Sequence, residues 1–306
     1  MRVIRAAHLG FCFGVRDALQ VVAEVAEPRE VTIRGELVHN PLVLHQLDDR
    51  GFQREPESDR TSVPATDQVM ITAHGISDRE RQRLQAAGKQ LIDTTCPLVT
   101  RVHRAAQQLA REGRHVIVIG RPEHVEVNGI VEDLPSATVI PGVSQIGELP
   151  SRFLGVVCQS TTPPRLAAEV VEALRTRYPD ADLRAIDTIC QPTRDRQQAV
   201  LDLLPGIDAL VVVGGKNSNN TRELARLAEE RGVRTLHIEH PSDLEPGWFA
   251  GVRTCGLTAG TSTLDSTVEA VELALGQLTA GVENEVNKTP HATPRIAEEC
   301  PSLGAA

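Results

Sequence analysis

The stretch Gly10-Phe11-Cys12-Phe13-Gly14-Val15-Arg16 decides the fold, because its local design occurs three times along the chain. Each copy places a cysteine directly before an amphipathic helical pattern, with a basic residue four or five positions later. The other copies are Thr94-Thr95-Cys96-Pro97-Leu98 and Thr188-Ile189-Cys190-Gln191-Pro192. The cysteines lie 84 and 94 residues apart, and either spacing suits one small lobe of helices and strands. We therefore expect three similar lobes, each presenting one cysteine toward a common centre.

Short runs rich in Val and Ile alternate with helical patterns throughout the chain. The strands that we expect cover residues 69–72, 115–119, 153–157, 209–213 and 252–257. Helical patterns cover residues 15–25, 98–109, 166–174, 199–204, 224–228 and 268–275. This alternation predicts an α/β fold with parallel sheets, in which ligands bind at the carboxyl ends of the strands.

The spacing of the cysteines also predicts where the lobes begin and end. Lobe one covers residues 13–95, lobe two 96–189 and lobe three 190–281, and a strand within residues 1–12 joins lobe three. Residues 282–306 are polar, contain three prolines and lack periodicity, so we expect an irregular tail. Cys300 lies in that tail and is expected to be incidental.

The composition argues against several classes of protein. The 306 residues carry a net charge of −9 and are 2% aromatic, which disfavours nucleic-acid binding through a basic face or stacked bases. No apolar run is long enough to span a membrane, and the N-terminus lacks the features of a signal peptide. We expect a cytoplasmic protein that binds neither nucleic acid nor membranes.

Six cysteines without a CxxC pair indicate metal binding or catalysis rather than a disulfide framework or a zinc finger. Cys12, Cys96 and Cys190 precede helices, whose positive ends favour the metal-binding thiolate. Three thiolates around a 4Fe–4S cluster would leave one iron open to a substrate oxygen. Unrelated structural roles for these three cysteines stay open at this point. Cys158 and Cys255 lie in apolar strands and are expected to be buried core residues.

Histidines, hydroxyls and amides gather where the expected strands end and helices begin. Such groups suit a pocket for a diphosphate, although Ser218, Asn220 and Ser262 are also natural helix caps. The segments contain His39-Asn40, His74-Gly75, His124 with Glu126, Gln159-Ser160-Thr161-Thr162, Lys216-Asn217-Ser218-Asn219-Asn220 and Ala259-Gly260-Thr261-Ser262. Neither a Walker A loop nor a Rossmann glycine fingerprint is present.

In these segments the chain resembles the hydroxymethylbutenyl diphosphate reductases, known as the IspH or LytB family. The resemblance follows family order over about residues 8–265. It is carried by Gly-Phe-Cys-Phe-Gly-Val-Arg at 10–16, Leu-Val-His-Asn at 37–40, Ala-His-Gly at 73–75, Thr-Cys-Pro-Leu-Val-Thr at 95–100, His-Val-Glu-Val at 124–127, Ile-Cys at 189–190, Lys-Asn-Ser-Asn-Asn at 216–220 and Thr-Ala-Gly-Thr-Ser at 258–262.

The resemblance implies a three-lobed α/β fold around a 4Fe–4S cluster held by Cys12, Cys96 and Cys190, with one open iron. It implies reductive removal of the hydroxyl group from 4-hydroxy-3-methylbut-2-enyl diphosphate, giving isopentenyl and dimethylallyl diphosphates in the last step of the methylerythritol phosphate pathway. Glu126 matches the proton donor, and ferredoxin- or flavodoxin-type carriers are the implied electron donors. The substrate-binding residues implied are His39, His74, His124, Ser160, Ser218, Asn219, Asn220 and Ser262.

The chain departs from the family pattern at four places. Ser160 stands where a threonine is usual, and Asn219 replaces the middle serine of Ser-Ser-Asn. The usual Thr-Thr-Asn-Arg-Gln after the third cysteine reads Thr-Arg-Asp-Arg-Gln at 193–197, with Arg194 and Asp195 changed, and Thr263-Leu264 replaces a common Ala-Pro. These changes leave open a paralogous reductase of a related allylic diphosphate.

Two further functions stay open on the sequence. A cluster-binding sensor or electron carrier would need no proton donor, so His124 and Glu126 argue against it. A zinc hydrolase with Cys and His ligands is the other alternative. If residues 124–126 are extended, the side chains of His124 and Glu126 emerge on the same face.

Overall fold

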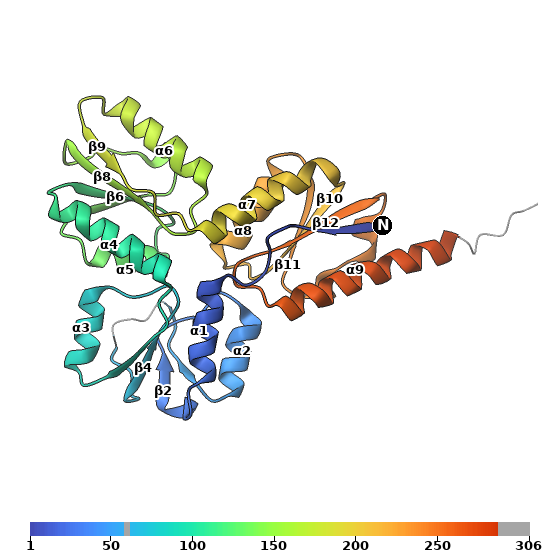
Figure 1. Ribbon diagram of the computed structural model, residues 1–306, viewed down its shortest axis with the longest axis horizontal. Helices are drawn as coiled ribbons and strands as arrows, with labels where there is room; N and C mark the ends of the chain where they lie inside the picture. The colour runs from blue at the N-terminus through green and yellow to red at the C-terminus, as the bar shows by residue number, and fades with distance from the viewer. Residues whose placement is uncertain (58–61, 287–306) are drawn as a thin grey trace, which may run out of the picture.

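The computed structural model describes residues 1–57 and 62–286, with the backbone alone for residues 279–286. The described chain forms three four-stranded sheets, in which every pair of neighbouring strands is parallel. Helices cover each sheet, and the resulting three lobes meet at the centre of the molecule (Figure 1). The predicted α/β fold with three similar lobes is therefore confirmed. We keep the lobe boundaries proposed from the sequence to name the lobes.

Lobe one lies at the bottom of Figure 1 and contains a sheet in the order β3-β2-β4-β5. Its strands are β2 (Val31–Ile33), β3 (Gln53–Arg54), β4 (Gln68–Ile71) and β5 (Gln90–Asp93). Its helices are α1 (Phe13–Ala23), α2 (Pro41–Asp49) and α3 (Asp78–Ala86). A short 3₁₀ turn, Pro28–Glu30, leads into β2.

Lobe two lies at the upper left of Figure 1, with its sheet in the order β7-β6-β8-β9. Its strands are β6 (His115–Ile119), β7 (Ala137–Ile140), β8 (Phe153–Cys158) and β9 (Asp182–Ala185). Its helices are α4 (Pro97–Arg111), α5 (Val125–Glu132) and α6 (Pro164–Arg177). Every residue of β6 is buried, as expected of a central parallel strand with helices on both faces.

Lobe three lies at the right of Figure 1, with its sheet in the order β1-β12-β10-β11. Its strands are β1 (Arg2–Arg5), β10 (Ala209–Val213), β11 (Arg234–Ile238) and β12 (Thr254–Ala259). Its helices are α7 (Gln191–Leu203), α8 (Asn219–Glu229) and α9 (Asp265–Val286). The N-terminal strand pairs with β12, so β1 belongs to the same lobe as the last described helix, α9. None of the described helices combines the length and the apolar character that a membrane span requires.

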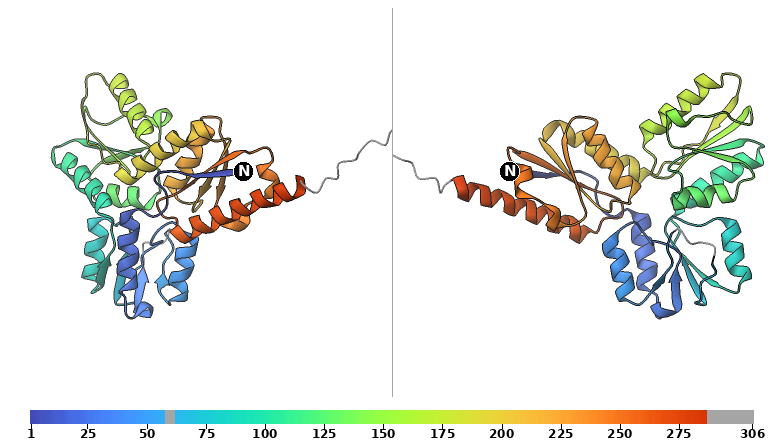
Figure 2. Two further views of the ribbon diagram at one scale, coloured as in Figure 1. Left: turned by 45° about the vertical axis from the view of Figure 1, so that its right-hand side comes forward. Right: turned by 180° about the vertical axis from the view of Figure 1, so that it is seen from behind.

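Helices α1, α4 and α7 begin near the centre and run outward from it, as both views of Figure 2 also show. Each of them follows a strand and begins directly after one of the three repeated cysteines. The short apolar strands form the cores, and the amphipathic faces of the helices pack onto them; for example Val102 and Leu109 of α4 are fully buried.

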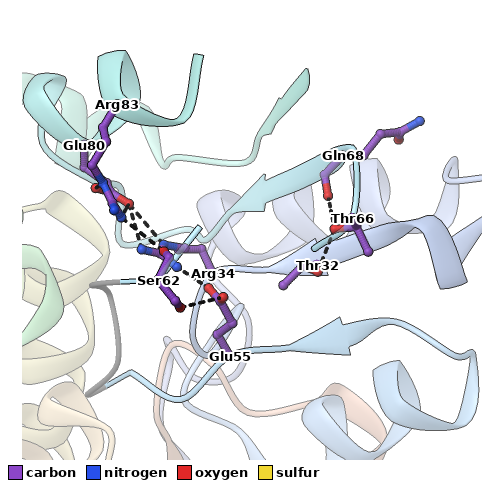
Figure 3. Close-up of polar contacts among 8 residues, drawn as sticks. All are labelled: Thr32, Arg34, Glu55, Ser62, Thr66, Gln68, Glu80 and Arg83. Atoms are coloured by element: carbon purple, nitrogen blue, oxygen red, sulfur yellow. Dashed lines mark hydrogen bonds and ion pairs between the residues drawn. The ribbon is translucent and has the colours of Figure 1, made fainter. Parts of the chain in front are cut away.

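Lobe one also contains a buried charge network centred on Arg34, the residue that follows β2 (Figure 3). The Arg34 side chain is 0% exposed and forms ion pairs with Glu55 and Glu80, the latter at 2.8 Å. Arg83 also binds Glu80, with 2.7 Å between Nε and Oε2. Burial would raise the pKa of Glu80, but hydrogen bonds and charges from Arg83 and Arg34 outweigh it and hold that pKa below its ordinary value. The network fixes the chain that leads from β2 toward the centre.

The prediction of an irregular tail from residue 282 is wrong for its first five residues, since α9 continues to Val286. Residues 282–286 read Val-Glu-Asn-Glu-Val and contain no proline, so nothing in them stops a helix that is already formed. Residues 287–306, including Cys300, lie outside the described residues.

Several elements were not predicted from the sequence, among them α2, α3, α5 and the strands β2, β3, β5, β7, β9 and β11. Most of the missed strands have two to four residues, and several are largely exposed. For example β9 (Asp182–Ala185) buries no residue fully. Strands of this kind lack the apolar run or alternation that identifies a strand in a sequence.

Candidate functional site

One pocket at the meeting point of the lobes is lined by all the residues that the sequence nominated for the site. They come from every lobe and follow the ends of strands, where parallel sheets present their ligand-binding loops. The nominated residues are Cys12, His39, His74, Cys96, His124, Glu126, Ser160, Cys190, Ser218, Asn219, Asn220 and Ser262. Their individual roles are predictions, whereas their proximity is an observation.

The positive ends of five helices converge on this pocket. The N-cap residues of α1, α4, α5, α7 and α8 all line it, and they are Cys12, Cys96, His124, Cys190 and Ser218. Each helix N-terminus carries unpaired N–H groups and a partial positive charge. The pocket therefore favours an anionic ligand although the whole chain is acidic.

The three cysteines occupy equivalent positions, one at the start of the first helix of each lobe. None of the three thiols caps the backbone of its own helix. A Cβ atom at Gly14 would lie 2.5 Å from Sγ of Cys96, so the helix that begins after Cys12 packs against Cys96 only because Gly14 has no side chain. The structure thus brings to one pocket the three sulfur atoms that directly precede the first helix of each lobe.

Two of the three thiols are harder to ionise than expected from their positions before helices. Burial raises the pKa of Cys96. It also raises the pKa of Cys190 to about 11, although a hydrogen bond with Thr193 lowers that pKa. In the metal-free protein, burial therefore has a larger effect on the pKa of these two thiols than the positive helix ends have. Metal binding would have to displace the protons.

The thiols are not arranged for a single metal ion. Within residues 1–57 and 62–286, no three Cys, His, Asp or Glu side chains are close enough to share one ion. A multi-iron cluster separates its ligands, because each thiolate binds a different iron atom. The cysteine arrangement fits such a cluster, and it offers no support for the alternative of a zinc hydrolase.

Three histidines form a second wall of the pocket. The rings of His39 and His74 are stacked with centroids 4.3 Å apart, and His124 meets both edge-on at 5.4 and 5.6 Å. Glu36 lies behind His39, with its Oε2 2.7 Å from Nδ1 of the ring. Sequence reasoning missed Glu36, although an acidic residue three positions before a candidate histidine was a usable signal.

His124 is held as a neutral ring. Its Nδ1 accepts a hydrogen bond from the backbone N–H of Glu126 at 3.1 Å, which leaves the proton on Nε2. Burial, together with the neighbouring His39 and Arg121, lowers the pKa of His124 to about 3. The ring therefore presents an N–H donor and no charge at neutral pH.

Residues 124–126 do not form an extended segment, because His124 caps α5 and Glu126 lies in its first turn. Glu123 adopts a left-handed φ of 64°, which turns the chain into the helix at this point. Both side chains still line the pocket.

Glu126 is 1% exposed and receives two hydrogen bonds from Ser160. Burial raises the pKa of Glu126 to about 7, although those bonds act in the opposite direction. A carboxyl group with this pKa can carry a proton at neutral pH and can also release it.

Two serines of the pocket have hydrogen-bond partners within the protein, whereas one buried asparagine has none among the described residues. Ser218 caps α8, accepting from the backbone N of Thr221 at 3.3 Å, and Ser262 donates to the carbonyl of His39 at 3.1 Å. Asn220 is 2% exposed, and neither its amide oxygen nor its amide nitrogen has a partner among the described residues. A buried amide in that condition indicates a polar ligand.

Four residues that depart from the family pattern make identifiable contacts within the protein. Ser160 uses its hydroxyl to hold Glu126. Asn219 donates from Nδ2 to Oγ1 of Thr161 at 3.2 Å and so links lobe three to lobe two. Asp195 accepts from Gln191 on the surface, and Leu264 packs on the core of lobe one.

The chain is similar to known proteins over most of its length. Residues 3–276 match the family described as LytB protein. The chain is 35% identical over 287 residues to 4-hydroxy-3-methylbut-2-enyl diphosphate reductase of Aquifex aeolicus, covering 91% of this chain and 97% of that one. It is 37% identical over 275 residues to the enzyme of the same name from Anaeromyxobacter sp. strain Fw109-5, covering 89% and 95%.

Two solved structures are similar over nearly the whole chain. One is an (E)-4-hydroxy-3-methyl-but-2-enyl diphosphate reductase described as the terminal enzyme of the non-mevalonate pathway. It has a TM-score of 0.63 and 34% identity, covering 90% of this chain and 100% of that one. The other is the E-1-hydroxy-2-methyl-but-2-enyl-4-diphosphate reductase from Plasmodium falciparum, with a TM-score of 0.80 and 25% identity, covering 98% and 95%.

Proposed function

The chain belongs to the LytB protein family, and from that premise we propose that it reduces 4-hydroxy-3-methylbut-2-enyl diphosphate in the last step of the non-mevalonate route to isoprenoids. The observation that carries the proposal is that three cysteines, three histidines and a buried glutamate line one pocket. In this reaction the allylic C–O bond breaks and a C–H bond forms. Two electrons and two protons are consumed, water leaves, and isopentenyl and dimethylallyl diphosphates are the products.

Cys12, Cys96 and Cys190 would hold an iron–sulfur cluster of the 4Fe–4S type. Their shared position at helix N-caps and their common pocket support this assignment. When bound, the cluster supplies electrons and, at the iron without a cysteine ligand, a Lewis acid for the substrate oxygen. Electrons would reach it from a ferredoxin- or flavodoxin-type carrier, and the cytoplasmic location expected from the sequence stays a prediction.

The diphosphate would lie against the helix N-termini and the polar wall. His39, His74, Ser218 and Ser262 supply donors there, and the unpaired amide of Asn220 gains a partner. The neutral ring of His124 adds an N–H donor from the same side as Glu126. A charged ligand of this size is held best by many such fixed donors.

Glu126 would deliver a proton to the leaving oxygen, because C–O cleavage otherwise expels hydroxide. Its raised pKa keeps part of the population protonated at neutral pH. Ser160 orients the carboxyl group through two hydrogen bonds. A sensor or electron carrier would have no use for a buried, oriented acid beside an unpaired amide.

The experiment that tests the function uses anaerobically reconstituted protein. Iron and sulfide content and the visible spectrum report the cluster, and turnover of the allylic diphosphate with reduced viologen reports the reaction. We expect both product isomers. A loaded cluster without turnover of this substrate would favour a paralogous reductase, to be tested on related allylic diphosphates.

A further inference from the structure

A buried arginine connects the segments that carry two of the three cysteines. Arg196, in the second turn of α7, is only 6% exposed. Its Nη1 donates to the carbonyl of Pro192 at 3.1 Å and its Nη2 to the carbonyl of Gly10 at 2.5 Å. Its Nε–H is buried and has no partner among the described residues.

No carboxylate of the described chain forms an ion pair with Arg196, in contrast to its neighbour Arg194, which pairs with Asp187 at 2.6 Å. Burial lowers the pKa of Arg196, and Cys12, Cys190 and Asp195 act in the opposite direction. Asp195 itself accepts a hydrogen bond from Gln191. A cation buried without a counter-ion is costly, so such a site is expected to face an anion.

We propose that the guanidinium of Arg196 is the buried countercharge of the iron–sulfur cluster and makes its reduction more favourable. The inference rests on the proposed function, since it assumes the cluster at Cys12, Cys96 and Cys190. Three thiolates make that centre negative, and every added electron makes it more so. A fixed positive charge nearby stabilises the reduced form over the oxidised form.

Arg196 also ties two cysteine segments together. Gly10 lies two residues before Cys12, and Arg196 belongs to the helix that Cys190 begins. The bond to the Gly10 carbonyl therefore fixes the segment of Cys12 against the helix of Cys190. Arg196 is thus a positioning residue as well as a charge, and a test has to separate the two roles.

The test is a potentiometric titration of the reconstituted cluster, followed by electron paramagnetic resonance, with iron and sulfide measured on the same samples. The variants are Arg196→Gln, which keeps a hydrogen-bond donor without the charge, and Arg196→Lys, which keeps the charge. Arg194→Gln is the matched control, because it removes a surface charge two residues away that Asp187 already neutralises.

We expect the midpoint potential to become more negative in Arg196→Gln, to stay near that of the wild type in Arg196→Lys, and to stay unchanged in Arg194→Gln. An unshifted potential in Arg196→Gln at full iron content would overturn the inference. If Arg196→Gln fails to hold the cluster, recovery of iron in Arg196→Lys supports the charge role, and failure in both variants overturns it. A wild-type protein that binds no cluster would instead refute the proposed cofactor.

Discussion

Ser160 holds the carboxyl group of Glu126 from two directions, with its backbone N 2.6 Å from Oε1 and its Oγ 2.9 Å from Oε2. Glu126 lies in the first turn of α5, whereas Ser160 follows the end of β8. The two residues are 34 positions apart, and the lobe-two sheet brings them together. The hydroxyl that the sequence assigned to the substrate therefore has a partner within the protein.

Replacing Glu126 with glutamine should reduce turnover at least about a hundredfold, the lower range for loss of a general acid. The amide keeps the shape of the side chain but cannot deliver a proton. Iron content and substrate affinity should stay near those of the wild type, which measurements on one preparation can check. Glu132→Gln, at the exposed end of the same helix, is the control. Wild-type turnover in Glu126→Gln would remove Glu126 from the mechanism.

The pH profile of turnover should depend on Ser160. If Glu126 acts as an acid with a pKa of about 7, activity falls as pH rises through that value. The hydrogen bonds from Ser160 lower this pKa, so Ser160→Ala should move the falling limb to higher pH. Ser160→Thr keeps the hydroxyl, so its turnover should stay near that of the wild type and should fall at the same pH. A complete loss of turnover in Ser160→Thr would indicate a pocket shaped for another substrate.

Glu126 should contribute stability to the metal-free protein that is lost as pH rises. Its pKa is raised from the ordinary 4.5 to about 7 in the folded state, so folding favours the protonated form. The stability is fully present below pH 4.5 and is lost as pH rises through 7. At 1.36 kcal/mol per unit the loss is on the order of 3 kcal/mol.

Chemical denaturation of metal-free wild type and Glu126→Gln at pH 5 and pH 8 measures this effect. From pH 5 to pH 8 the free energy of unfolding should fall more in the wild type than in Glu126→Gln. An equal pH dependence in both proteins would show that Glu126 ionises freely in the folded state.

Serine at position 12, 96 or 190 should abolish or severely deplete the cluster, because each thiol comes from a different lobe and none can replace another. Iron and sulfide analysis after anaerobic reconstitution measures this. Cys255→Ala and Cys158→Ala are controls, since both lie in buried strand positions away from the pocket lining. The controls should keep their iron and lose some stability through a small cavity. Full iron content in any of the three serine variants would contradict the assignment.

Arg34→Met should destabilise lobe one by about 3 kcal/mol, the lower end of the cost of breaking a buried ion pair, because Arg83 still neutralises Glu80. The carboxylates of Glu55 and Glu80 would lose their shared cation. Urea denaturation at pH 7 reports the change. Arg54→Met, which breaks a partly exposed pair with Asp48, should cost far less. An equal loss of unfolding free energy in both variants would show that the buried network stabilises the protein no more than a partly exposed ion pair does.

The sequence predicted the three-lobed α/β fold because the patterns that indicate it lie within short segments of the chain. A cysteine before a helix, repeated at lobe-sized spacing, indicates the same starting point in each lobe. Buried strands such as β6 and β10 are continuous apolar runs and were located to the residue. Short or exposed strands such as β9 carry no such pattern, because tertiary pairing rather than composition makes them strands.

The chemistry of the site depended on the tertiary structure. The types of residue indicated a cluster and an anionic ligand, and the order of the motifs indicated the family. Only the fold decided that Glu126 lies in the first turn of a helix and that Ser160 holds it. It also decided that burial raises the pKa of Cys96 and Cys190, and that Arg196 ties the helix of Cys190 to Gly10 without a carboxylate partner among the described residues. Residue type is a property of the chain, whereas desolvation and the distance between charges arise only when three lobes meet around one centre.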